Sequence, residues 1–291
     1  MRARRGCRLA RVVLVCLLAG SGGCASRARL WAVGALIEDV EAATARQQDV
    51  ALATQAAPAF LLMLEGLLES SPGDRRLLVA AARGYTAYGT LVAHSQPGRA
   101  RVLYERGMRL GLRALQADRR IGRLLDQPYP RFARITERLH RDDVPAVFWT
   151  ASSWGAWIGL SADDVAAVAQ LPKVVLLMEW VLGQDETFEH GAPHLFLGVY
   201  HAALPPALGG RPDEARAHFE RALQISQGRN LMARVLMARH YARQVQDREL
   251  FRSLLDKVLA SPVDAVPELT LQNAAAQEHA HALLRETDET W

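Results

Sequence analysis

The sequence predicts an all-α protein in which helical hairpins stack into one right-handed α-solenoid domain. Apolar residues recur at helical spacing along most of the chain, and the alternating runs typical of strands are not found in the sequence. In addition, one spacing of apolar residues followed by a turn returns at distant places in the chain. We therefore expect pairs of antiparallel helices joined by short turns.

Residues 1–23 have the composition of an export signal. Five arginines precede a short apolar stretch, which is followed by small residues and then by Cys24. This order is typical of a secretory signal, and the apolar stretch is too short to span a membrane as a stable helix. The segment also resembles the lipobox of bacterial lipoproteins, although Ser21 and Gly22 depart from its usual residues.

The resemblance to a lipobox implies that residues 1–23 are a lipoprotein signal peptide. Residues 24–29 would be a lipidated tether in front of one helical repeat domain over 30–291, and Cys24 would be the lipidation site. The absence of Asp after Cys24 implies sorting to the outer membrane in preference to the inner membrane. Ordinary secretion, with Cys24 incidental, is the alternative.

The charge balance depends on this signal. The whole chain has a formal net charge of +4, but without the five arginines of residues 1–23 it has 30 basic against 31 acidic residues. The basic balance therefore gives no reason to expect nucleic-acid binding, and no basic patch stands out in the sequence. Only Cys24 remains after the signal, so we expect neither a disulfide within the domain nor a cysteine nucleophile.

The first helix is expected over 30–49, where the apolar residues share one face and the acidic residues between them favour packing on the domain over lying on a membrane. Five helix pairs should follow it. Their expected boundaries are 50–69 with 74–93, 99–117 with 144–160, 163–183 with 192–204, 212–226 with 229–244, and 247–260 with 267–286. An arginine-rich connection with short helices separates the partners of the second pair.

Capping residues support several of these boundaries. Asp74 is expected to cap the helix over 74–93, and Asp143 the helix over 144–160, where Pro145 suits the first turn. Ser161 with Asp164 resembles a capping box at the start of the third pair. Acidic pairs at these helix starts are therefore interpreted as caps and not as catalytic carboxylates.

The uncharged stretch after Asp143 should form the central helix. It contains three of the six tryptophans, and its apolar residues fall on two opposite faces, which predicts a buried helix. Ala151, Gly155 and Gly159 form a stripe of small residues between these faces, where each glycine costs about 1 kcal/mol relative to alanine. Close approach of a neighbouring helix or a ligand would offset this cost. A membrane-spanning helix is the alternative.

One fragment matches the signature of a known repeat. Residues 215–223 read A-R-A-H-F-E-R-A-L, which is similar to the A-x-x-x-F-x-x-A-L pattern of the tetratricopeptide repeat (TPR). The related spacing at 60–72, which ends in a Ser-Pro turn, recurs at 250–262. In such repeats small residues let two antiparallel helices approach, the aromatic ring fills the gap, and the proline ends the second helix. The resemblance implies a TPR-like fold.

Longer motifs resemble the T component of TRAP transporters, the tripartite ATP-independent periplasmic transporters. The resemblance covers nearly the whole chain after the signal, in order. The motifs that carry it are Arg83-Gly-Tyr-Thr86, Asp143-Val-Pro145, Trp149-Thr-Ala-Ser-Ser-Trp154-Gly155, His194-Leu-Phe196-Leu, Ala203-Leu-Pro205, Leu208-Gly-Gly210, and 215–223 continued to Ser226-Gln-Gly228. One departure is Leu195, where the family pattern has an acid, and others are repeat prolines replaced by Arg120, Asp185 and Gln227.

This resemblance implies an accessory protein and not an enzyme, with no cofactor. Its partner would be the periplasmic solute-binding protein (the P component), which delivers solute to an ion-driven permease. Stacked helix pairs would offer an extended concave docking surface, a lipid at Cys24 would anchor it to a membrane, and a homo-oligomer is expected. The alternative is an envelope-assembly TPR lipoprotein that serves outer-membrane machinery and has no solute role.

Aromatic residues near the central helix are the candidate ligand-binding residues. They could form the core, or they could line an apolar cavity for a hydrophobic solute, because glycines beside them leave room. These residues are Phe148, Trp149, Trp154, Trp157, Phe196 and Tyr200.

The histidines do not form a convincing metal site in the sequence. His194 and His201 share a helix face, but His190 should lie outside the helix because Gly191 and Pro193 follow it. Packing or capping roles are therefore favoured over metal binding. No serine stands at a strand-to-helix elbow, so no catalytic triad is expected.

Overall fold

The computed structural model describes residues 34–204 and 209–290, with side chains up to residue 286. The chain divides into two compact units, one ending at Ala43 and one beginning at Thr44. In the first unit residues 34–43 are helical, and everything below concerns the second unit. Cys24, the expected signal peptide and the expected tether lie outside the described residues.

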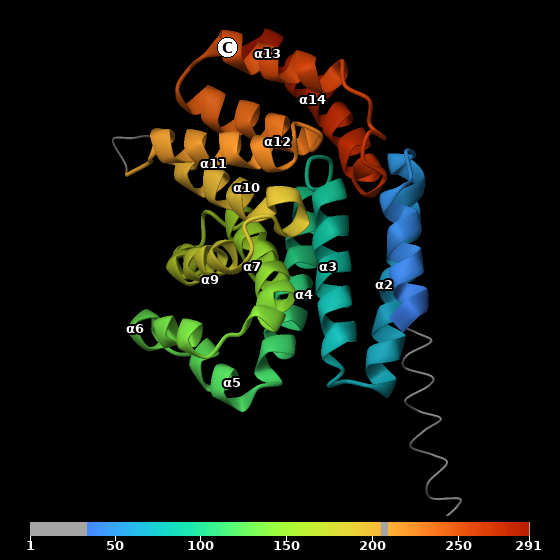
Figure 1. Cartoon of the computed structure of the whole chain (residues 1–291), viewed down its shortest axis with the longest axis vertical. Coiled ribbons are helices and arrows are strands. Elements are labelled where there is room, and N and C mark those ends of the chain that lie inside the picture. Colours follow the sequence, from blue (N-terminus) through green and yellow to red (C-terminus); the bar gives the residue numbers. More distant parts are fainter. Residues whose placement is uncertain (1–33, 205–208, 291) are drawn as a thin grey trace, which may run out of the picture. The chain divides into compact units, whose positions relative to one another are not determined.

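Every regular element in the described part of the second unit is a helix, which confirms the all-α prediction, and no strand occurs there (Figure 1). η1, η2 and η5 are short 3₁₀-helices, and η4 is a π-helical continuation of α12. The elements are α2 Val50–Ser70, α3 Arg75–Val92, α4 Pro97–Gln116, α5 Arg119–Leu125, α6 Tyr129–Phe132, η1 Ala133–Glu137, η2 Arg141–Asp143, α7 Val144–Gly159, α8 Val165–Val168, α9 Leu171–Gln184, α10 Phe188–Ala202, α11 Pro212–Ile225, α12 Leu231–Leu236, η4 Met237–Ala242, α13 Arg248–Leu259, η5 Pro267–Leu269 and α14 Thr270–Thr290.

Helices pack mainly against helices that are close to them in the sequence. α2 lies on α3, α3 on α4, α4 on α7, α10 on α11, and α13 on α14. Long-range contacts join α12 to α14 and α3 to α7. In Figure 1 the hairpin of α10 and α11 lies between the α3–α4–α7 layer and the C-terminal helices. The expected pairs 50–69/74–93, 99–117/144–160 and 247–260/267–286 are thus present, with Asp74 capping α3 through Arg76 N–H at 2.9 Å.

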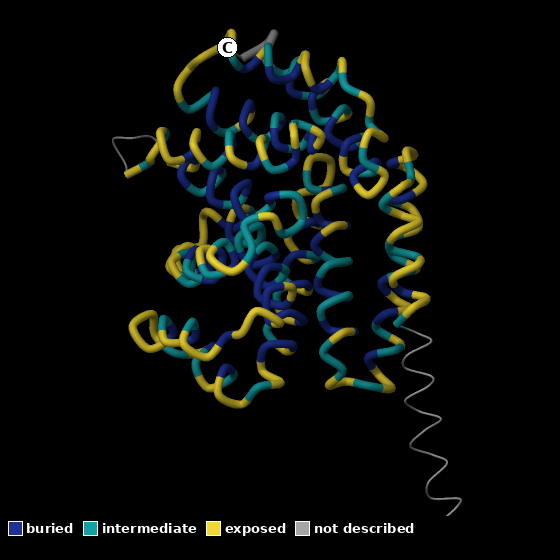
Figure 2. Tube along the Cα trace, in the orientation of Figure 1, coloured by how far each residue is buried: buried dark blue, intermediate teal, exposed yellow. Residues whose placement is uncertain are grey.

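Nine of the 16 residues of α7 are buried, and much of its trace is dark blue in Figure 2. Val147 and Ala151 have no exposed surface, and Trp154 and Ile158 are buried on the same face. The opposite face, with Trp149 and Trp157, is only half-buried. The prediction of a buried helix therefore holds for one face, while the other is left incompletely covered.

In the α10–α11 hairpin the apolar residues of the TPR-like fragment are buried between helices. Ala215, Phe219 and Ala222 of α11 are fully buried. Gly198 of α10 lies against the Phe219 ring, and a β-carbon built on Gly198 would stand 3.1 Å from three ring atoms. A small residue thus lets the helices approach, and the aromatic ring fills the gap.

The prediction of a single helix over 163–183 is wrong. The chain forms α8, breaks after Val168, and starts again as α9 at Leu171. Pro172 stands in the first turn of α9, where it lacks an N–H and favours a new helix start. The capping box is also wrong, because Asp164 alone caps α8 by accepting from Ala166 N–H at 2.8 Å, while the buried Ser161 Oγ has no hydrogen-bond partner among the described residues.

Asp143 does not cap α7. Its carboxylate turns back to accept from His140 N–H at 2.7 Å and forms an ion pair with Arg75 of α3. This pair ties the start of α7 to α3. Pro145 does occupy the first turn of α7, as expected.

Two described helical stretches are long and apolar enough to cross a membrane by length and composition, Val50–Ser70 and Val165–Gln184. This is weak support for a membrane span, since core helices of other proteins meet the same criteria. The second stretch is also interrupted between α8 and α9. α7, with 16 residues, is shorter than the roughly 20 residues that a spanning helix needs.

Candidate functional site

An apolar cavity of ≈ 610 Å³ lies among α3, α7, α10, α12 and α14. Four of the six predicted aromatic residues line it, namely Phe148, Trp149, Phe196 and Tyr200. The ring of Phe148 contacts Trp149 edge-on, with centroids 4.9 Å apart. A cavity of this size and composition is typical of a site for a small apolar molecule.

Trp154 and Trp157 stand outside the lining. Trp154 is buried on the far face of α7, where its Nε1 donates to Gln170 Oε1 at 3.1 Å and its ring lies edge-on to Phe132. Trp157 is half-buried, and its Nε1 has no hydrogen-bond partner in the described part of the chain. Both indoles belong to the packing around α7 and not to the cavity wall.

The cavity faces the small-residue side of α7. Phe148, Ser152, Gly155 and Gly159 line it at offsets of 0, 4, 7 and 11, which is one stripe of a helix. A β-carbon on Gly155 would lie 2.8 Å from Phe196 Cζ, so this glycine lets α10 approach. A β-carbon on Gly159 would meet nothing within 4 Å, because it would point into open space.

A left-handed turn joins the cavity to a polar network. Glu189, His190 and Gly191 have φ values of 46°, 60° and 87°, a region that L-residues rarely occupy. Gly191 packs here against Ala222 of α11, with 3.3 Å between its ideal β-carbon and Ala222 Cα. The turn sends Glu189 into the cavity wall, while Glu186 before it joins the network. As expected from Gly191 and Pro193, His190 stands outside regular helix.

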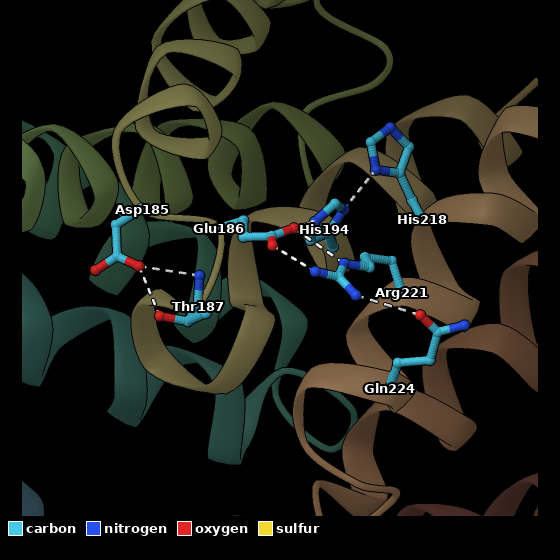
Figure 3. A network of polar contacts seen from close by, with 7 residues as sticks. All are labelled: Asp185, Glu186, Thr187, His194, His218, Arg221 and Gln224. Atoms are coloured by element: carbon cyan, nitrogen blue, oxygen red, sulfur yellow. Dashed lines mark hydrogen bonds and ion pairs between the residues drawn. The ribbon is translucent and has the colours of Figure 1, made fainter.

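The polar network centres on Glu186, His194 and Arg221 (Figure 3). Glu186 Oε2 accepts from Arg221 Nε at 3.0 Å and lies 3.2 Å from His194 Nε2, and its other oxygen pairs with Arg221 Nη2. His194 Nδ1 is 2.9 Å from His218 Nδ1. Asp185, next to Glu186, turns away to accept from the Thr187 hydroxyl at 2.7 Å.

The chemistry of these atoms fixes where the protons lie. A carboxylate only accepts, so His194 must donate from Nε2 to Glu186, and its Nδ1 then accepts from the Nδ1–H of His218. The hydrogen bonds from Arg221 and then from His194 lower the pKa of Glu186 to about 2. Burial lowers the pKa of His194 despite the opposing effect of Glu186. The acid beside His194, which Leu195 does not provide, thus comes from Glu186.

A third imidazole completes a histidine cluster made of His194, His201 and His218. The His201 and His218 rings stack with centroids 5.5 Å apart, and His201 Nε2 lies 3.5 Å from Glu214 Oε2. Burial, followed by the charges of the two neighbouring histidines, lowers the pKa of His218 to about 4. Within the described residues no group of three or more His, Cys, Asp or Glu side chains is arranged to hold a metal ion.

Sequence reasoning missed Glu186, Glu189 and His218. His218 could have been found, because it precedes Phe219 inside the TPR-like fragment and one hairpin brings it opposite His194. The two glutamates gave no comparable signal, since their positions depend on the left-handed turn.

Comparison with known proteins identifies the family of this chain. Residues 46–291 match the family model described as "TRAP transporter T-component". The chain is also similar to a protein of Treponema pallidum (strain Nichols) that is described as "Uncharacterized protein". The two are 24% identical over 264 residues, which cover 81% of this chain and 79% of that protein. The family is a transporter accessory component and not an enzyme class, and this chain belongs to the TRAP transporter T-component family.

Proposed function

We propose that this T component binds an apolar or amphipathic solute in the cavity beside α7 and exchanges it with a periplasmic solute-binding subunit. The observation that carries the proposal is the cavity itself. Its lining is almost entirely aromatic and aliphatic, and it includes Leu195 where the family pattern has an acid. Transfer of apolar surface from water into such a space contributes about 25 cal/mol per Å², so a solute of this class needs few polar contacts to bind.

Anchoring and docking complete the proposal. A lipid on Cys24 would hold the protein at the envelope, on the outer membrane in preference to the inner, with the helical unit facing the periplasm. Adjacent hairpins such as α2–α3 and α10–α11 support a TPR-like solenoid that offers its surface to the partner and to further copies of itself. The two roles are separable, because docking uses the surface and solute binding uses the interior.

Solute binding is tested with matched tryptophan variants of α7. The purified protein is delipidated, and the neutral dye N-phenyl-1-naphthylamine is titrated against wild type, Trp149→Ala and Trp157→Ala. Trp149 lines the cavity and Trp157, which is also half-buried, does not. Saturable dye binding that only Trp149→Ala weakens supports the proposal. No binding by wild type, or equal loss in both variants, refutes it.

Docking is tested separately with a TRAP solute-binding protein from the same organism. The helical unit is immobilised and the partner is passed over it at micromolar concentration, with and without extracted solute. Saturable binding supports the transporter role. The absence of binding, together with an empty cavity, would favour an envelope-assembly scaffold instead.

A further inference from the structure

The cavity wall contains one carboxylate. Glu189 is the one Asp, Glu, Lys or Arg side chain in the described lining, and it stands among aromatic and aliphatic neighbours. The remaining polar groups of the lining are uncharged hydroxyls, an amide and His279, whose pKa burial lowers. A formal negative charge in such a wall is costly unless it has partners.

The partner that the structure gives Glu189 leaves this carboxylate incompletely satisfied. Arg83 Nη2 lies 3.6 Å from Glu189 Oε1, which is longer than a hydrogen bond. The Arg83 guanidinium also lies over the Trp149 ring, 5.4 Å from its centroid. No hydrogen bond to the Glu189 carboxylate occurs among the described residues, so its oxygens keep their accepting capacity.

The backbone that positions the Glu189 side chain is strained. Glu189 and His190 both have left-handed φ and ψ, a conformation that is unfavourable for L-residues. Such a conformation persists only where the surroundings determine it, and it is frequent at binding sites. The close packing of Gly191 on Ala222 accounts for the glycine, but not for two strained residues before it. The strained turn is what directs Glu189 to the cavity.

We propose that Glu189 recognises the head group of an amphipathic solute whose tail fills the cavity, and that this head group is a hydrogen-bond donor, an ammonium or a hydroxyl. The inference deepens the proposed function and rests on it. A purely apolar solute would remove water from the carboxylate and return no hydrogen bond. A carboxylate head would be repelled. The strained turn and the long contact with Arg83 leave the acceptor free to meet a donor.

The test measures head-group preference apart from cavity binding. Decylamine, decanol and decanoate, each below its micellar concentration, displace N-phenyl-1-naphthylamine from wild type, Glu189→Gln, Glu189→Asp and Glu179→Gln. Glu179 is an exposed glutamate of α9 outside the lining, so its variant is the matched control. Because Glu189 is partly exposed, we expect decylamine and decanol to bind about three- to tenfold more tightly than decanoate.

Each outcome decides between the two proposals. A donor-head preference in wild type and Glu179→Gln that falls by at least about threefold in Glu189→Gln, with unchanged dye affinity, supports the role of Glu189. An equal preference in all proteins, or a preference for decanoate, overturns that role and leaves cavity binding intact. If wild type binds no dye, the cavity proposal and the role of Glu189 fail together. If Glu189→Gln does not fold, wild type and Glu189→Asp are compared instead. Tighter binding of decylamine and decanol than of decanoate in both proteins supports the role of Glu189, and the absence of this order in wild type overturns it.

Discussion

Acid should destabilise this fold through the histidine cluster, and His218 should account for a measurable part of the loss. His218 is half-buried on α11. The titratable groups that face it are His194 and His201 of α10, with Glu214 and Arg211 at the start of α11. Burial is the main reason that its folded-state pKa falls to about 4, and the two histidines add to the effect. The ordinary pKa of a histidine is about 6.5.

The sign follows from which state binds the proton first. Because the folded-state pKa is depressed, the unfolded chain takes up the proton as the pH falls below about 6.5, while the folded chain resists until about 4. Stability is therefore full above this window and is lost through it. One such group lowers the free energy of unfolding by about 2 kcal/mol between pH 7 and pH 5. The loss reaches about 3 kcal/mol once the pH is below the folded-state pKa of about 4.

The assay is urea unfolding followed by circular dichroism at pH 7, 6 and 5. Wild type should lose stability on acidification, and His218→Gln should lose about 2 kcal/mol less than wild type between pH 7 and pH 5. His281→Gln, an exposed histidine of α14, should behave as wild type. Identical pH dependence of wild type and His218→Gln would refute the reasoning, since another group would then bind the proton.

Three further predictions concern packing, the cavity and a cap. Phe219→Ala removes a fully buried ring and should lower the free energy of unfolding by about 3–5 kcal/mol in urea titrations. Gly155→Ala should push the Phe196 ring toward the cavity and weaken dye binding in the fluorescence titration, while the exposed Gly183→Ala should leave dye binding unchanged. Asp74→Ala removes the acceptor for two N–H groups at the start of α3 and should cost about 0.5–2 kcal/mol in the same urea assay.

Two exposed residues provide the controls for stability. Arg216→Ala lies one turn from Phe219 but faces solvent, and Asp142→Ala removes an exposed carboxylate that caps no helix. Each should change the free energy of unfolding by less than about 0.5 kcal/mol. Equal losses in Phe219→Ala and Arg216→Ala would contradict the packing argument, and equal losses at Asp74 and Asp142 would contradict the capping argument.

Helix periodicity and capping residues were sufficient to predict most of the helices from the sequence. Apolar spacing and Asp74 located the α2–α3 hairpin almost to the residue, because both signals act within one turn of helix. The break between α8 and α9 was missed although Pro172 marks it, since apolar residues continue through the break and conceal it. Asp143 was misassigned for a different reason, because its partner Arg75 is far away in the sequence.

The cavity could be predicted only in part. The two apolar faces of α7 were separated correctly, but both were expected to carry lining residues. The structure places much of the cavity along a third stripe, where Phe148 and Gly155 stand, and at Trp149 beside it, while Trp154 and Trp157 are turned away from it. Which stripe faces open space depends on how α3, α10 and α14 close around the helix. That arrangement is a tertiary property which a helical wheel does not contain.

Several features that destabilise the fold lie around the cavity. Gly155 costs about 1 kcal/mol relative to alanine within α7, and Glu189 and His190 add left-handed strain on the opposite wall. A β-carbon at Gly159 would enter open space and meet nothing within 4 Å, so packing does not require that glycine. A chain selected for stability alone would fill the space with larger side chains. The concentration of these costs around one apolar cavity with one carboxylate is therefore the physical reason to infer that the cavity is kept open for a solute.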